Sequence, residues 1–133
     1  MGAWGPGSFE NDAALDWVLE LNDAEDATPI DTALMNVADA EDEYLDVDEA
    51  SEAIAAAEVV AALAGRPAAT LPEAVTVWVS ASTVSVSSYY IDLATHAVAK
   101  VRTNSELQGL WDESPQADEW YQVLDDLEAR LKE

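Results

Sequence analysis

The densest group of chemically active side chains in this sequence is an acidic run between residues 39 and 52. Carboxylate oxygens are the ligands that hard cations such as Ca²⁺ take, in sets of about six to eight. The run lacks the glycine and the D-x-D-x-D-G spacing of a calcium loop, and half of it is expected on helices, with side chains pointing apart. A solvated acidic face is therefore the favoured interpretation, and a specific metal site is the alternative. The run holds eight carboxylates, Asp39, Glu41, Asp42, Glu43, Asp46, Asp48, Glu49 and Glu52.

The single histidine, His96, is the other side chain suited to catalysis. Asp92 lies one helical turn before it, and a catalytic triad needs an acid to orient its base. The apolar positions Tyr90, Leu93 and Ala97, however, place His96 on the exposed side of a predicted helix. The Asp92–His96 pair is thus expected to be an ordinary surface contact.

No catalytic, cofactor-binding or metal-binding residue is assigned. The chain has no cysteine, which excludes disulfides and thiolate chemistry and is typical of a cytosolic protein. Its glycines form neither a P-loop nor a dinucleotide-binding fingerprint. With 28 acids in the sequence, adjacent carboxylate pairs are expected by chance, so they do not indicate acid–base catalysis.

Three aromatic residues near the N-terminus, Trp4, Phe9 and Trp17, either line a ligand pocket or plug one end of a helical bundle. Chain termini usually fray unless something holds them, and aromatics at helical spacing are usually core. We therefore predict a structural plug, in which the nearby glycines let Trp4 and Phe9 fold back onto the helix that carries Trp17.

The elements that would position these residues are mostly helices. Helical spacing of apolar residues predicts segments starting between residues 8 and 12, at residue 28, near residue 49, near residue 87, at residue 105 and at residue 114. Residues 49–64 are alanine-rich and apolar nearly all round, so this segment should be the central helix. Gly65 and Pro67 would end it. The predicted fold is a single all-α domain over residues 1–133, an orthogonal bundle of about six helices.

Residues 71–90 give two conflicting signals. LPEAV starts like a helix, whereas Val75, Val77 and Val79 alternate with polar residues and Trp78, which is the period of a strand. A short hairpin over residues 75–88 is one possibility. We favour a short helix and a Ser/Thr-rich loop, because an isolated hairpin is marginally stable.

Charge is the extreme property of the composition. The formal net charge is −23, and no Lys or Arg precedes Arg66. Such a chain repels nucleic acid and anionic membranes, so direct binding to nucleic acid is not expected. The sequence shows no signal peptide and no apolar run long enough to span a membrane, so we expect a cytoplasmic protein.

Three blocks of sequence carry a family resemblance. They are the core WGPGSFEND at residues 4–12, SEAIAAAEVVAALAGRP at residues 51–67 and SELQGLWDES at residues 105–114. Together they resemble the family known as domain of unknown function 4259. The resemblance implies a small, soluble bacterial protein and supplies no reaction, ligand or catalytic residue.

The sequence favours a non-enzymatic interaction module of the immunity, antitoxin or regulatory type, which uses its acidic face to bind a basic protein. One alternative is a DNA mimic, whose carboxylates imitate the phosphates of a duplex. A second is a cation-binding protein or metal-dependent enzyme. Adaptation to high salt is a further explanation of the acidity.

Overall fold

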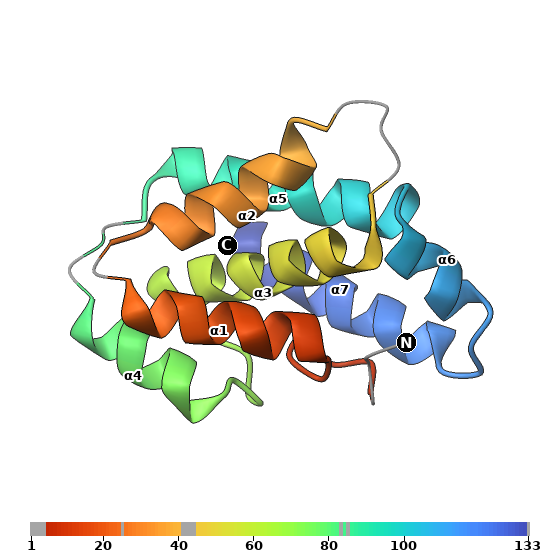
Figure 1. Ribbon diagram of the computed structural model, residues 1–133, viewed down its shortest axis with the longest axis horizontal. Coiled ribbons are helices and arrows are strands. Elements are labelled where there is room, and N and C mark those ends of the chain that lie inside the picture. The colour runs from red at the N-terminus through yellow and green to blue at the C-terminus, as the bar shows by residue number, and fades with distance from the viewer. Residues whose placement is uncertain (1–4, 25, 41–44, 83, 85, 133) are drawn as a thin grey trace.

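The computed structural model describes residues 5–24, 26–40, 45–82, 84 and 86–132. Within these ranges the chain forms seven helices and no strand, which confirms the all-α prediction. The helices are α1 (Asp12–Asp23), α2 (Thr28–Ala38), α3 (Val47–Leu63), α4 (Glu73–Ala81), α5 (Ser88–Thr103), α6 (Glu106–Asp112) and α7 (Ala117–Lys132), arranged as Figure 1 shows.

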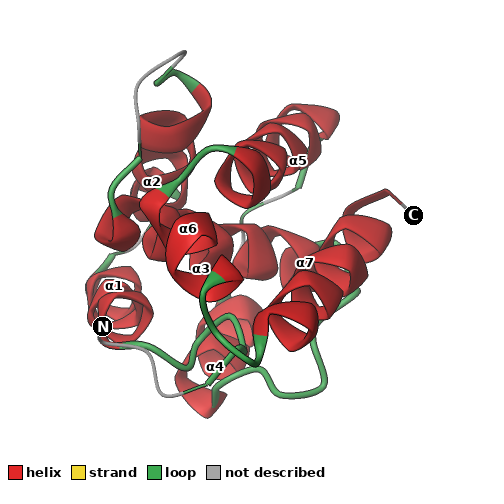
Figure 2. Ribbon diagram, turned by 90° about the vertical axis from the view of Figure 1, so that its right-hand side faces the viewer, coloured by secondary structure: helices red, strands yellow, loops and turns green. Residues whose placement is uncertain are grey.

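Helix α3 is the centre of the fold, as its alanine-rich sequence predicted. It contacts each of the other six helices, and Figure 2 shows it in the middle of the bundle. Twelve of its seventeen residues are buried. Because most of these are alanines, neighbouring helices can approach α3 from every side. The helix ends at Leu63, and the predicted glycine follows at Gly65, whose φ of 89° favours a residue without Cβ.

The helix starts follow local capping chemistry. The Asn11 side chain accepts a 2.8 Å hydrogen bond from the backbone of Ala14 and caps α1. The Ser105 side chain accepts a 3.0 Å hydrogen bond from the backbone of Gln108 and caps α6 at the residue where the sequence predicts a helix start. The sequence also predicts a helix start at Thr28, which is the first residue of α2, and Ala27 occupies the cap position.

Residues 73–81 form α4, which confirms the favoured short helix, and the hairpin possibility is wrong for residues 75–81. Val75 is buried, and Trp78 and Val79 pack partly against the core. These positions have the i, i+3, i+4 spacing of one helical face. Packing of this face on α1 and α3 therefore overrides the alternating pattern. Residues 83 and 85 lie outside the described part.

The C-terminal helix α7 buries one apolar face, whose residues are spaced three and four positions apart. Trp120, Leu124, Leu127 and Leu131 are all buried. Helices α3, α5 and α6 lie against it. None of the helices in the described ranges is long and apolar enough to cross a membrane.

Enlarging a side chain in the middle of α3 tests its central position. Ala56 is fully buried, so Ala56→Leu should overpack the core and destabilise the protein by about 1–3 kcal/mol. The matched control is Ala99→Leu on α5, where the side chain is exposed and little change is expected. Urea denaturation measures both. Equal stability of the two variants would contradict the tight packing of α3.

Candidate functional site

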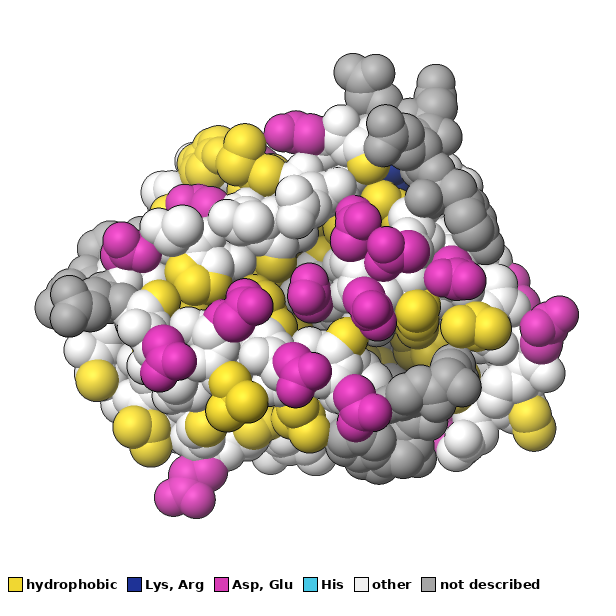
Figure 3. Space-filling model, viewed as in Figure 1, with side chains coloured by type: hydrophobic (Ala, Val, Ile, Leu, Met, Phe, Trp, Pro, Cys, Tyr) yellow, Lys and Arg dark blue, Asp and Glu magenta, His cyan; other side chains and the backbone are white. Residues whose placement is uncertain are grey.

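Carboxylates from two helices gather on one side of the molecule. Glu52 of α3 lies close enough to Asp46, Asp48, Glu49 and Glu20 for their charges to raise its pKa. We call these five residues the α1–α3 acidic face. Figure 3 shows Asp and Glu side chains spread over this side, with scarcely any Lys or Arg in view.

The structure divides the predicted acidic run rather than keeping it together. Asp46 is the N-cap of α3, and its carboxylate accepts a 2.8 Å hydrogen bond from the backbone of Glu49. Asp48 is exposed in the first turn, where its negative charge interacts favourably with the positive end of the helix dipole. Asp39 is exposed at the other end of the run, as the C-cap of α2. Glu41, Asp42 and Glu43 lie outside the described residues.

Glu20 is the member of the face that the acidic run did not contain. It is exposed on α1, more than thirty residues before Glu52 in the sequence, and only the packing of α1 on α3 brings the two carboxylates together. The spacing of Asp16 and Glu20 was a weak signal, since it places both on one face of a helix.

Glu52 has a raised pKa. Partial burial is the main cause that raises its pKa, followed by the charge of Glu20 and then by the acids of α3 itself. Both causes disfavour the ionised form. The ionised form of Glu52 therefore lowers the stability of the folded protein.

The positively charged residues lie on other elements than the α1–α3 acidic face. Arg66 follows α3, Lys100 and Arg102 are on α5, and Arg130 and Lys132 are on α7. Arg102 binds Asp125 at 2.8 Å and also Glu128, which raises the pKa of Arg102 and ties α5 to α7. Its guanidinium lies 5.5 Å from the ring centre of Tyr121.

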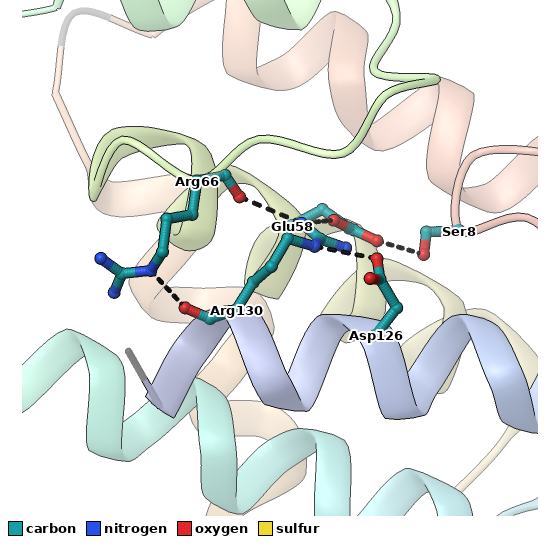
Figure 4. A network of polar contacts seen from close by, with 5 residues as sticks. All are labelled: Ser8, Glu58, Arg66, Asp126 and Arg130. Atoms are coloured by element: carbon teal, nitrogen blue, oxygen red, sulfur yellow. Dashed lines mark hydrogen bonds and ion pairs between the residues drawn. The ribbon is translucent and has the colours of Figure 1, made fainter.

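A buried carboxylate on α3 uses another of these cations (Figure 4). Glu58 is 2% exposed. One of its oxygens binds the Arg130 guanidinium at 2.9 Å, and the other accepts a 2.7 Å hydrogen bond from the Ser8 hydroxyl. Arg130 also donates to the Arg66 carbonyl and pairs with Asp126. The network joins the N-terminal segment, α3 and α7.

Sequence reasoning missed this network. The only signal was an acid in the middle of an otherwise apolar helix, which predicts a buried partner without saying which residue supplies it. Ser8, Glu58 and Arg130 also line a cleft of about 700 Å³ beside residues 68–70 and α7. The contacts of Glu58 neutralise its charge and satisfy both of its oxygens, so the arrangement ties three segments together.

The predicted aromatic plug lies partly within the described residues. Trp17 is 3% exposed, and its indole N–H donates to the Pro29 carbonyl at 3.3 Å. Phe9 is partly buried and packs against the core. Trp4 lies outside the described part, so its fold-back stays a prediction.

The lone histidine lies where the sequence predicted. His96 is exposed on α5, and the described structure gives it no ion pair with Asp92. Across the described ranges, no three His, Asp or Glu side chains come together as ligands for a metal ion.

Breaking the buried ion pair should be costly. Arg130→Met leaves the Glu58 carboxylate buried without its cation, so we expect a loss of about 3–5 kcal/mol in unfolding free energy. The double variant Glu58→Gln, Arg130→Met removes the charge as well and should recover part of that loss. Urea denaturation of both variants measures the difference. A double variant no more stable than Arg130→Met would show that the stranded charge is not the cause.

Neutralising Glu52 should have the opposite effect. Its folded-state pKa is raised, so the ionised side chain opposes folding once the pH exceeds the ordinary glutamate value of about 4.3. Glu52→Gln should therefore gain a few tenths of a kcal/mol at pH 7.5, the scale of like-charge pairs on a helix. The gain should shrink as the pH falls toward the ordinary value, and also in molar salt. Thermal unfolding at several pH values checks this, and a loss of stability at pH 7.5 would contradict it.

Comparison with known proteins identifies the family and no more. The family model described as a domain of unknown function (DUF4259) matches residues 2–123. Neither the curated proteins nor the solved structures that were searched gave a match. The matched range runs from the N-terminal segment into α7 and includes Ser8, Glu58 and all five residues of the α1–α3 acidic face. The chain therefore belongs to the domain of unknown function 4259 family.

Proposed function

We propose that this protein is a non-enzymatic interaction module that binds a basic partner protein through the α1–α3 acidic face. The observation that carries the proposal is the gathering of four carboxylates around that of Glu52, on elements that hold none of the chain's Lys or Arg residues. A positively charged partner would relieve the repulsion among these groups. It would also be steered toward the face by long-range attraction.

Exposed apolar side chains beside the acids favour a protein as the partner. Leu15 and Leu19 are 37% and 66% exposed, and they lie one turn apart on α1. Asp16 and Glu20 follow them at the same spacing. An apolar strip bordered by charge is a common arrangement at protein interfaces, where the apolar part supplies affinity and the charged part supplies orientation.

A double charge reversal tests the face. Glu20→Lys with Asp48→Lys changes two of its acids, and the control, Asp92→Lys with Asp118→Lys, changes exposed acids on α5 and α7. The control is matched, because Asp48 and Asp118 both lie in the first turn of a helix and both variants have the same net charge. Any difference between them therefore reports position and not total charge.

Affinity capture from cell lysate at about 0.15 M salt, followed by measurement of Kd with the purified partner, provides the readout. We expect wild type and control to retain a basic protein, and the face variant to bind it about tenfold or more weakly. Equal binding by both variants, or capture of no basic protein, would refute the proposal. Release of the captured protein by duplex DNA would instead identify the chain as a DNA mimic.

A further inference from the structure

A small pocket opens within the acidic side of the fold, between α1, α2 and α3. Its volume is about 240 Å³. Its buried members are Trp17 and Ala33, with Pro29 beside them, and its more exposed members are Glu20, Thr32 and Glu52. Figure 3 shows hydrophobic side chains deep between the helices on this side, with Asp and Glu side chains around them.

The size and the lining of the pocket restrict what fits it. Pockets that enclose a whole small molecule usually measure about 300–1,000 Å³, so this one suits a single side chain. Its apolar wall would accept methylene groups, and the carboxylates of Glu20 and Glu52 at its mouth would accept hydrogen bonds from a cation. An acidic or neutral side chain would leave these two charges facing each other without relief.

We propose that this pocket receives an arginine side chain from the basic partner. The aliphatic part of arginine would lie along Trp17, Pro29 and Ala33, and its planar guanidinium would lie between Glu20 of α1 and Glu52 of α3. Arginine fits better than lysine because its guanidinium has several donors in one plane and stacks favourably on aromatic rings. This inference rests on the proposed function and names the contact that would anchor the partner.

Titration with a small arginine derivative distinguishes binding in the pocket from binding elsewhere on the α1–α3 acidic face. N-acetyl-arginine amide is added to ¹⁵N-labelled protein, and amide and indole shifts are followed by NMR. N-acetyl-citrulline amide has nearly the same shape without the charge and serves as the control probe. We expect saturable shifts for the arginine probe at the Trp17 indole N–H and at the amides of Thr32 and Glu52, and much smaller shifts for the citrulline probe.

Three variants make the test specific. Glu52→Gln should weaken binding of the arginine probe about tenfold, because it removes a charged hydrogen-bond acceptor. Thr32→Tyr should weaken it by obstructing the mouth without changing the charge of the face. Asp92→Asn, which removes an exposed charge on α5, should leave binding unchanged. Circular dichroism and melting temperature establish that each variant folds.

The outcomes distinguish this inference from the proposed function. NMR shifts that are absent, do not saturate or spread over all exposed acids would refute the proposed arginine site. So would partner binding that Thr32→Tyr leaves unchanged, although the acidic face would then stand as the interface. Specific binding of the arginine probe with no basic protein captured from lysate would uphold the pocket and refute the proposed function.

Discussion

The fold depends on one constraint, the enclosure of α3 from residue 53 to residue 62. Every residue in this stretch is buried among the neighbouring helices, so nearly all of them must be small or apolar. The exception is Glu58, whose charge would be very costly at that depth without a partner. Arg130 from α7 and the hydroxyl of Ser8 supply the missing contacts. The central helix thereby fixes the positions of both the N-terminal segment and the last helix.

This constraint also arranges the charges of the protein. With only five basic residues against 28 acids, each cation used inside the fold is unavailable elsewhere. Arg130 pairs with Glu58, and Arg102 holds α5 against α7. The ion pairs of Arg102 and Arg130 are made with acids outside the α1–α3 acidic face, and the charge of this face is what we propose an outside partner neutralises. The internal ion pairs and the proposed interaction surface both follow from the small number of basic residues in the chain.

Much of the fold could be predicted from the sequence because its signals are local. The alanine-rich run identified α3, Gly65 its end, and Ser105 the start of α6, since helix spacing and capping depend on residues a few positions apart. The candidate site was predicted less well. The acidic run supplied Asp46, Asp48, Glu49 and Glu52, whereas Glu20 joined them only through the packing of α1 against α3. No local pattern records a contact between residues so far apart.

The sequence by itself determined the helical class, the buried central helix and the lack of cations before Arg66. Tertiary structure decided three further points: that residues 73–81 take the favoured helix and not the alternative strand, that Glu58 pairs with Arg130, and that Trp17, Glu20 and Glu52 share a pocket. In the first case two local periods competed, and burial of Val75 against the core selected the helix. In the others, the partners lie on helices far apart in the sequence. Propensity and capping act within a turn or two of the chain, whereas ion pairs and pockets form only where packed helices meet.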